Sequence, residues 1–313
     1  MENNIDVSII IVNYNTCMLL KNCLLSIFKH TKYITFEVIV SDNGSSDGSL
    51  EMLHQEFPNV LVIENKANLG FGVANNKGLS ISKGKYILYL NSDTVLLNNA
   101  VKYFFDYWEK SNDKEKIGAL GSILLNENNE VIHSFGNFPS YRKEIEKLFI
   151  VNIKIFVSEI FGFLHIQIPH RKKNISRSFY TGEVDYITGA DLFLLNDENA
   201  YFDEKYLLYF EETDLQYSLK AKGKKRIIIG APQIMHLEGS SNKSDKNSLI
   251  RYLSFSAVQI LFSRIIYFKK NNKKTFSLFI VYFLSLMYLC HFGLIFKTKE
   301  FRKRLSDIYH KEF

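Results

Sequence analysis

The sequence predicts an α/β fold in which a mostly parallel central sheet is flanked by helices. The run VSIIIVNYN (residues 7–15) is continuous, apolar and β-branched, as expected for a strand that is covered on both faces. The run TCMLLKNCLLSIFKHT (16–31) then spaces its apolar residues as an amphipathic helix does. This alternation of strand and helix repeats along the first half of the chain, which favours parallel strands joined by right-handed crossovers.

The other elements of the first half follow the same order. Three further strands are predicted in FEVIVSDNG (36–44), VLVIENK (60–66) and KYILYLNSD (85–93). Helices are predicted between them, in SSDGSLEMLHQEF (45–57), which opens with capping Ser and Asp residues, and in GFGVANNKGLSISKG (70–84).

The second half is less regular. Residues 141–178 are aromatic, basic and poorly periodic, and we interpret them as a mobile or acceptor-specific insertion. The predicted elements around them are a helix at 100–110, a strand at 117–125, a strand at 184–196, and a strand or strand pair from 225 that ends at His236. The segment 201–223 runs into a helix that has Glu211 and Glu212 at its start and stops at Gly223.

Polar residues follow three of the predicted strands at the point where each strand ends. These are Asn13–Asn15, Asp42–Asn43 and Asp93. Ligands of parallel α/β sheets bind at the carboxyl ends of the strands, so the three clusters predict a site. Taken singly, Asp93 in LYLNSDTVLL is also compatible with a turn residue at a strand end.

Charge is distributed unevenly along the 313 residues, which carry a net charge of +6. Residues 251–313 contain 12 Lys and Arg against 3 Asp and Glu, and these basic residues flank an apolar segment. This pattern favours a membrane surface as partner and argues against nucleic acid. The three cysteines show no CxxC spacing, and the N-terminus lacks the basic residues of a signal peptide, so we expect a reducing, cytosolic environment.

Several motifs in fixed order resemble the inverting GT-A glycosyltransferases of family 2, in particular the bacterial rhamnosyltransferase-like branch. The resemblance covers residues 5–242 and implies a GT-A domain at 1–245, with 141–178 as a variable insertion, followed by a helical tail at 246–313. The motifs are VSIIIVNYN, VIVSDNGSSDGS, NLGFGVANNKGL, YLNSDT, ITGADLFLL with FDEKYLLYFEETDLQ, and MHLEGSS.

The resemblance implies a divalent metal, Mn or Mg, that neutralises the diphosphate of a nucleotide-sugar donor. The family's DxD motif reads Asn91-Ser92-Asp93 here, so Asp93 is the expected metal ligand, with His236 as the second. It also implies contacts to the nucleotide and diphosphate from Asn13, Asn15, Asp42, Asn68, Gly70, Lys77, Asn91 and Ser92. For Asp47 we prefer a capping role.

The same resemblance implies a catalytic carboxylate within Glu211-Glu212-Thr213-Asp214. We expect Glu212 to be the general base, Glu211 to be the second candidate and Asp214 to support them. The alternative is an acidic first turn that favours the helix dipole. Asp191 stands where the family usually has a small or apolar residue, and contact with the acceptor is one role open to it.

The tail segment TFSLFIVYFLSLMYLCHFGLIF (275–296) contains no Lys, Arg, Asp or Glu and is long enough to span a membrane. Both flanks are basic, so we favour peripheral association with the cytoplasmic face of the inner membrane over spanning. Packing of the tail on the GT-A core, or on the second subunit of a homodimer, is the alternative.

The sequence thus predicts an inverting, metal-dependent glycosyltransferase. It would move a sugar from dTDP-rhamnose or a UDP-hexose to a lipid-linked or polysaccharide acceptor in bacterial surface glycan synthesis. The alternative is a non-catalytic GT-A module that binds a nucleotide or glycan and scaffolds a membrane assembly. A nucleotidyltransferase would show a Gly-rich turn with Arg and Lys after the first strand, and VNYNTC has neither.

Overall fold

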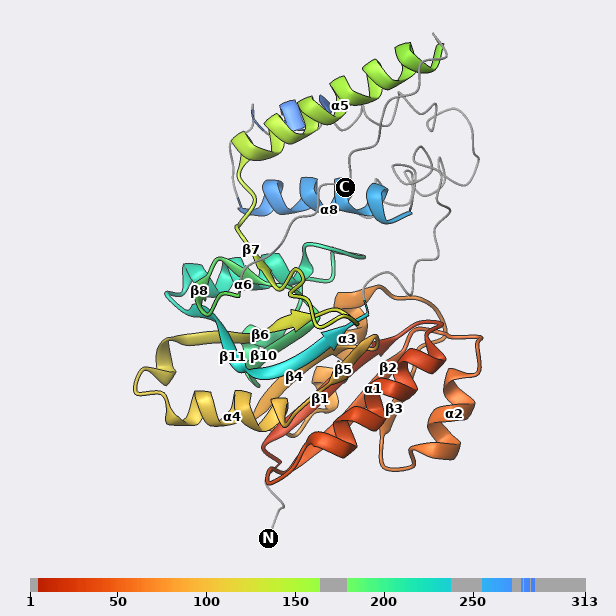
Figure 1. The fold of residues 1–313 in the computed structure, drawn as a ribbon, viewed down its shortest axis with the longest axis vertical. Helices are drawn as coiled ribbons and strands as arrows, with labels where there is room; N and C mark the ends of the chain where they lie inside the picture. Colours follow the sequence, from red (N-terminus) through yellow and green to blue (C-terminus); the bar gives the residue numbers. More distant parts are fainter. Residues whose placement is uncertain are drawn as a thin grey trace. The chain divides into compact units, whose positions relative to one another are not determined.

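The structure is a computed structural model that describes residues 5–163, 179–237 and 255–271, with residues 277, 279–281 and 283–284. The chain divides into two compact units (Figure 1). The sheet unit comprises Met1–Phe138 and Ile175–Lys246, and the helical unit comprises Pro139–Asn174 and Asn247–Phe313.

A nine-stranded sheet forms the centre of the sheet unit. Its strand order is β3-β2-β1-β4-β10-β6-β11-β5, and β8 also pairs with β11. The strands are β1 (Val7–Asn13), β2 (Phe36–Asp42), β3 (Leu61–Glu64), β4 (Tyr86–Asn91), β5 (Thr94–Leu96), β6 (Ile117–Leu125), β8 (Gly182–Val184), β10 (Asp191–Leu195) and β11 (Lys225–His236).

The first four strands in the sheet, β3, β2, β1 and β4, are parallel, and β6 is parallel to β11. Strand β10 runs antiparallel between β4 and β6, and β5 and β8 are antiparallel to β11. The predicted α/β fold with a mostly parallel sheet is therefore confirmed. The carboxyl ends of β1, β2 and β4 meet at one edge, because Asn13 pairs with Asp42 and Val12 with Asn91.

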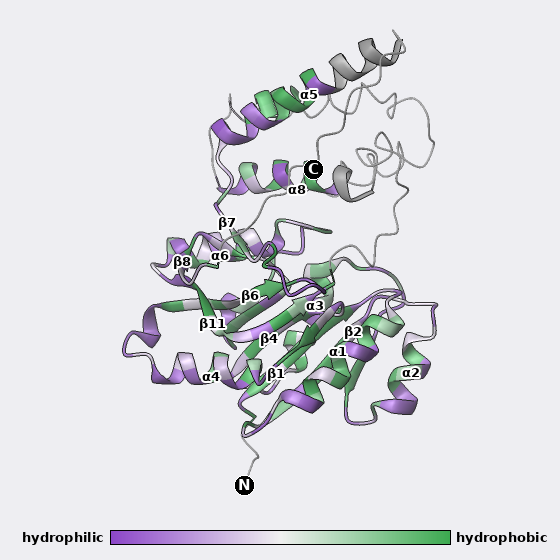
Figure 2. Cartoon of the chain, viewed as in Figure 1, coloured by the Kyte–Doolittle hydropathy of each residue, from purple (hydrophilic) through white to green (hydrophobic). Residues whose placement is uncertain are grey.

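Helices cover both faces of this sheet. They are α1 (Cys17–His30), α2 (Ser49–Glu56), α3 (Phe71–Ile81), α4 (Ala100–Lys110) and α6 (Glu211–Ala221). Helices α1, α2 and α4 bury their apolar residues in one core, while α6 packs on the opposite face. Figure 2 shows the strands as predominantly hydrophobic and these helices as mixed, which is typical of buried strands under amphipathic helices.

One expected strand differs from the structure. The segment predicted as one strand at 184–196 is broken into the end of β8, the short β9 (Tyr186–Ile187) and β10; β9 pairs with β7 (Phe135–Gly136) in a separate sheet. The helix in 201–223 begins at Glu211, as predicted, and it cannot begin earlier because Tyr209 and Phe210 have φ values of 69° and 70°, which a right-handed helix excludes.

The segment interpreted as an insertion contains a helix. Residues Tyr141–Phe163 form the 23-residue helix α5, and the interpretation of 141–178 as an insertion stays a prediction. Residues 164–178 lie outside the described residues. Helix α5 belongs to the helical unit, together with α8 (Phe255–Asn271).

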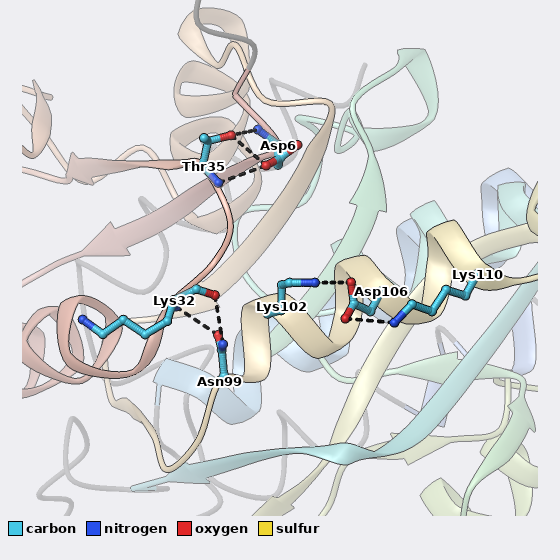
Figure 3. A network of polar contacts seen from close by, with 7 residues as sticks. All are labelled: Asp6, Lys32, Thr35, Asn99, Lys102, Asp106 and Lys110. Atoms are coloured by element: carbon cyan, nitrogen blue, oxygen red, sulfur yellow. Dashed lines mark hydrogen bonds and ion pairs between the residues drawn. The ribbon is translucent and has the colours of Figure 1, made fainter.

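Polar contacts fix the amino edge of the sheet, opposite the clustered strand ends (Figure 3). Thr35 donates through its backbone N–H and its hydroxyl to Asp6 Oδ2, at 2.9 and 2.7 Å, where β1 and β2 begin. Asn99 exchanges two hydrogen bonds with the backbone of Lys32, and Asp106 on α4 pairs with Lys110 at 3.3 Å. These contacts hold α1 and α4 in place at a distance from the clustered strand ends.

Buried contacts hold the helices of the helical unit together. The rings of Tyr141 and Phe268 stack with centroids 4.2 Å apart, and Arg264 Nε lies 2.8 Å from Glu144 Oε2. Within the described residues, no helix is both long enough and apolar enough to cross a membrane. Most of the apolar tail segment at 275–296 falls outside those residues.

Candidate active site

Side chains at the ends of β1 and β2, which were predicted to lie at one edge of the sheet, are hydrogen-bonded to each other. The Asn13 amide donates to Asp42 Oδ2 at 2.7 Å and to Ser45 Oγ at 3.0 Å. Asp42 Oδ1 in turn accepts from the backbone N–H groups of Gly44 and Ser45, at 3.0 and 2.8 Å. Asn13 and Asp42 are fully buried, so they shape the loop after β2, and their predicted contact with a nucleotide stays a prediction.

Thr16 connects this pair to the end of β4. Its hydroxyl donates to Asn13 Oδ1 at 2.6 Å and lies 2.9 Å from Ser92 Oγ, the middle residue of Asn91-Ser92-Asp93. Sequence reasoning missed Thr16, although it directly follows the first polar cluster. The three polar clusters predicted to share one edge are thus brought together through single hydrogen bonds.

Asn15 and Asp47 organise the neighbouring loop. Asn15 has a φ of 53°, and its Oδ1 accepts from the Ser46 N–H at 2.8 Å. Asp47 Oδ2 accepts from the N–H of Cys17, the first residue of α1, and Asp47 Oδ1 accepts from Ser49 at the start of α2. The prediction that Asp47 caps a helix is confirmed, at two helix termini.

The loop before α3 carries the next predicted residues. Asn68 Oδ1 accepts from the Gly70 N–H at 3.0 Å, and the Asn43 amide donates to the Gly70 carbonyl at 3.1 Å. Gly70 has a φ of +86°, and a Cβ atom there would lie 2.3 Å from the Leu207 carbonyl oxygen. This position therefore requires glycine. Lys77 is solvent-exposed and donates to Asn65 at 2.8 Å, one turn into the helix.

Asp93 and His236, the two predicted metal ligands, lie next to each other. His236 Nε2 is 3.1 Å from Asp93 Oδ1, and the two side chains are 12% and 13% exposed. The backbone joins them as well, because β11 pairs with β5 and the Leu237 N–H donates to the Asp93 carbonyl at 2.9 Å.

This pair fits a divalent cation. Asp93 Oδ1 and His236 Nε2 lie close enough together, at 3.1 Å, that both atoms could contact one cation. A carboxylate oxygen with an imidazole nitrogen suits Mn better than Mg. The described residues contain no group of three or more His, Cys, Asp or Glu that could hold a metal, so diphosphate and water oxygens would complete the shell.

The two adjacent glutamates at the start of α6 face different elements. Glu211 is 3% exposed, and its Cβ lies 3.8 Å from the position of a Cβ built on Gly72, at the start of α3. Glu212 is partly buried, and its Cβ and Cγ lie 3.7 Å from a Cβ built on Gly189, just before β10. The two side chains therefore leave the helix toward different elements, as their positions on one helix predict.

The segment that contacts Glu212 is also hydrogen-bonded to the Asn91-Ser92-Asp93 turn. The residue after Gly189, Ala190, accepts through its carbonyl from the Asn91 N–H at 3.0 Å. Gln216, one turn along α6, donates to the carbonyl of Glu212 at 3.0 Å and exchanges two hydrogen bonds with Ile187. The base candidate and the Asn91-Ser92-Asp93 turn are thus held by the same short stretch of chain.

Burial changes the acidity of both glutamates. Burial, and then the charge of Glu212, raises the pKa of Glu211 well above its usual value. Burial also raises the pKa of Glu212. Glu211 Oε2 is buried and has no hydrogen-bond partner among the described residues, whereas the Thr213 hydroxyl donates to Glu212 Oε1 at 3.4 Å. Asp214 is also buried, one turn inside the helix.

Asp191 is fully buried in β10 between β4 and β6. Its Oδ2 accepts from the Ser122 N–H at 2.7 Å, and burial raises its pKa to about 7. A side chain with no exposed surface does not touch an acceptor in this conformation, so the acceptor role considered from the sequence is not supported. The nearby His236 acts in the opposite direction to burial and lowers this pKa slightly.

The loop that precedes the glutamates has an unusual backbone. Tyr209 and Phe210, two consecutive residues with side chains, both occupy the left-handed region. Such strain of order 1–3 kcal/mol per residue is held by surrounding contacts and clusters at functional sites. Here the Leu207 carbonyl accepts from the Phe71 N–H at 3.1 Å. No sequence pattern signals this conformation in non-glycine residues.

One known protein family and several curated relatives match this chain. Residues 8–165 match the family model of Glycosyl transferase family 2, which is half of the chain. A poly(ribitol-phosphate) beta-glucosyltransferase of Bacillus spizizenii is 33% identical over 122 residues, which cover 37% of this chain and 19% of that enzyme. The chain spans half or less of the length of several relatives it matches.

A second relative is matched over most of its length. The N-acetylglucosaminyl-diphospho-decaprenol L-rhamnosyltransferase of Mycobacterium tuberculosis is 23% identical over 234 residues, which cover 67% of this chain and 69% of that enzyme. Among solved structures, the mannosyltransferase PcManGT from Pyrobaculum calidifontis, in complex with GDP-Man and Mn2+, is similar with a TM-score of 0.52 and 12% identity. That match covers 98% of this chain and 80% of the other. This likeness shows the GT-A fold.

Proposed function

Because the chain belongs to glycosyl transferase family 2, whose members act on nucleotide sugars in glycan synthesis, we propose that it is an inverting, metal-dependent enzyme with Glu212 as its general base. The observation that carries the proposal is the placement of Glu212 against Gly189, since the next residue, Ala190, is hydrogen-bonded to Asn91 and the Asp93–His236 pair lies at the end of the same turn. The cation, the diphosphate of the donor and the general base would then all lie at one edge of the sheet.

Asp93 and His236 would hold the cation. When bound, a divalent cation supplies charge neutralisation for the diphosphate that leaves the sugar. The protein side of the site contributes a single carboxylate and a single imidazole, both partly exposed toward solvent. Ser92 and Asn91 in the same turn would line the diphosphate, and the loop of Asn68 and Gly70 the nucleotide.

Glu212 would act on the acceptor. An acceptor hydroxyl oxygen attacks the anomeric carbon and forms the new glycosidic bond while the bond to the diphosphate oxygen breaks. The Glu212 carboxylate takes the hydroxyl proton, and the nucleoside diphosphate leaves with the bonding electron pair. A raised pKa makes this carboxylate a stronger base than an exposed glutamate, provided that it is ionised at the working pH.

Glu211 would have a positioning role. It is almost fully buried against Gly72 and has less access to an acceptor than Glu212. Its negative charge would also hinder ionisation of its neighbour, so a proton held on Glu211 would leave Glu212 free to act as the base.

For the acceptor we propose a lipid-linked glycan at the cytoplasmic face of the membrane. The supporting observation is the match to an enzyme whose name specifies a decaprenol-linked acceptor, over two thirds of both chains. The donor would be dTDP-rhamnose or a UDP-hexose, since both a rhamnosyltransferase and a glucosyltransferase are among the relatives.

A thermal-shift panel of UDP, dTDP and GDP, each with and without Mn²⁺, tests the donor site. A nucleotide at 100 times its Kd should stabilise the protein by about 2.7 kcal/mol. The Asp93→Ala variant should fold, because Asp93 lies at a strand end, and should lose the Mn²⁺-dependent part of the shift. A metal-dependent shift that persists in Asp93→Ala contradicts the ligand assignment. Nucleotide binding without turnover of any donor would instead favour a non-catalytic module.

A further inference from the structure

One face of α5 presents apolar side chains to solvent. Phe149, Ile150 and Ile153 are 57%, 49% and 46% exposed. Positions i, i+1 and i+4 of a helix fall within an arc of about 100°, so the three side chains form one stripe. We call these three residues the α5 stripe. Exposed apolar side chains that are grouped in this way mark an interaction surface more often than isolated ones do.

The opposite face of α5 is fixed inside the helical unit. Tyr141 stacks on Phe268, Glu144 pairs with Arg264, and the Asn152 amide donates to the carbonyls of Leu148 at 2.8 Å and Leu284 at 3.1 Å. Rotation of the helix to bury the stripe would break these buried polar contacts. The orientation that exposes the stripe is therefore built into the packing of the unit.

Lysines flank the stripe. Lys143, Lys147 and Lys154 are exposed, and they lie seven, three and four residues from Ile150, spacings that place them on the same side of the helix. Arg142 is paired with Glu146 at 3.1 Å, whereas no ion pair is found for the three lysines within the described residues. The exposed face of α5 thus combines an apolar stripe with three positive charges. Figure 2 shows that hydrophilic and hydrophobic residues alternate along this helix.

We propose that this face of α5 docks the protein on an anionic lipid surface. Apolar side chains beside lysines are typical of helices that lie in the headgroup region, where the stripe enters the acyl boundary and the lysines meet lipid phosphates. Protein interfaces, by contrast, are depleted of lysine. The placement of Lys147 and Lys154 next to Ile150 therefore favours lipid over a second protein chain.

A second apolar feature in the same unit has the same character. Phe279 and Phe283 are 62% and 52% exposed, and their rings stack with centroids 6.4 Å apart. The docking surface itself is independent of the donor chemistry. Only the role of this surface in bringing the active site to a lipid-linked acceptor rests on the proposed function.

Vesicle co-sedimentation of the full chain tests the proposal. The probes are phosphatidylcholine vesicles with and without phosphatidylglycerol. The stripe variant carries Phe149→Ser, Ile150→Ser and Ile153→Ser. The matched control carries Leu25→Ser, Tyr33→Ser and Ile81→Ser, three apolar residues of the sheet unit that are 50%, 92% and 42% exposed.

The stripe variant should bind anionic vesicles at least about tenfold more weakly than the wild type, and the control variant should bind unchanged. A third variant with Lys143→Glu, Lys147→Glu and Lys154→Glu should lose the preference for phosphatidylglycerol, by about fivefold per lysine. High salt should reduce the binding of the wild type to anionic vesicles and leave its binding to neutral vesicles unchanged.

Equal vesicle binding by the stripe variant and the wild type would overturn the proposal. If that variant also changed from dimer to monomer in size-exclusion chromatography, the stripe would be an interface between copies of the chain. If it instead lost thermal stability, the stripe would be covered by the chain's own residues. Mn²⁺-dependent nucleotide binding, measured on the same samples without vesicles, separates failure of the docking surface from failure of the proposed enzyme.

Discussion

Individual carboxylates of the site differ in their surroundings, and this sets their roles. Asp93 is partly exposed and lies beside the imidazole of His236. Asp42 is buried and accepts hydrogen bonds from two backbone N–H groups. Asp191 is also buried, and one of its oxygens has no hydrogen-bond partner among the described residues. Only the first of these is arranged to receive a ligand. Acidic residues at strand ends are therefore not equivalent, even where the sequence places them in similar positions.

The buried carboxyl of Asp191 predicts a pH-dependent stability. Its pKa is raised to about 7, so the folded protein holds this proton more tightly than the unfolded chain does. The stability that the proton confers is complete below pH 4 and is lost as the pH rises through 7. The Asp191→Asn variant cannot ionise. Its stability relative to the wild type should therefore increase by about 2–3 kcal/mol between pH 5 and pH 8, with a corresponding increase in relative Tm.

Melting curves in metal-free buffer at several pH values provide the measurement. Glu127→Gln, a change of an exposed loop carboxylate, is the control and should follow the wild type across this range. Parallel curves for Asp191→Asn and the wild type would show that Asp191 is already ionised in the folded protein at pH 5.

Among the secondary-structure elements, α3 and the loop before α6 depend on each other. The backbone of Leu207 approaches Gly70 so closely that a Cβ would lie 2.3 Å from its carbonyl oxygen. Gly48 has the same φ of +86° but nothing within 4 Å. The pair Gly70→Ala and Gly48→Ala therefore separates the effect of backbone conformation from the effect of this contact.

Gly48→Ala should lose about 1 kcal/mol of stability, the cost of the left-handed conformation. Gly70→Ala should lose about 2–4 kcal/mol and should also bind nucleotide more weakly, because the loop that carries Asn68 must move. Urea denaturation and nucleotide titration measure the two effects. Equal losses of stability in both variants would mean that the loop at Leu207 is free to move away.

The ion pair between α5 and α8 gives another test at this scale. Arg264 and Glu144 have side chains only 4% and 13% exposed. Removal of one partner leaves a buried charge and should destabilise the helical unit by about 3–5 kcal/mol, as in Arg264→Met. The double variant with Glu144→Leu should recover most of the loss. Proteolysis rates within α8 report the change, and a double variant as labile as Arg264→Met would show that the charge of Glu144 is not the cause.

The sequence predicted the regular elements well and the irregular ones poorly. Strands β1, β2 and β4 were predicted because continuous β-branched runs have few other uses. The left-handed Tyr209 and Phe210 before α6 were not predicted, since no local sequence pattern indicates this conformation in residues other than glycine. Helix α5 was missed because its exposed apolar stripe blurs the periodicity that an amphipathic helix shows.

The candidate site was predictable to a similar extent. The resemblance implied Asp93 and His236 as metal ligands, and the structure brings the two side chains to 3.1 Å from each other, while their role as ligands stays a prediction. Thr16 and Gln216 were not found, because their roles are to connect other residues and depend on distances between segments up to 76 residues apart.

For the whole molecule, the division into two units predicts how truncation acts. The helical unit combines segments from the middle and the end of the chain.

A chain cut after residue 246 loses α8, which exposes the buried Tyr141 and Leu148 of α5, and it should aggregate. Removal of 139–174 as well, with a short Gly-Ser linker, should restore solubility, since the rings of Phe135 and Tyr180 lie 5.3 Å apart. Light scattering compares the two proteins. Aggregation of both would show that the sheet unit does not fold alone.

The central claim is that Glu212 takes the acceptor proton while Glu211 positions it. The most direct measurement is the transfer rate of the full chain with its best nucleotide-sugar donor and Mn²⁺, for Glu212→Gln and Glu211→Gln at matched nucleotide saturation. Glu212→Gln should lower the rate by about 10²–10⁴-fold with nucleotide affinity retained, and Glu211→Gln should lower it less. A nearly wild-type rate for Glu212→Gln, together with an inactive Glu211→Gln, would reverse the two roles and contradict the account.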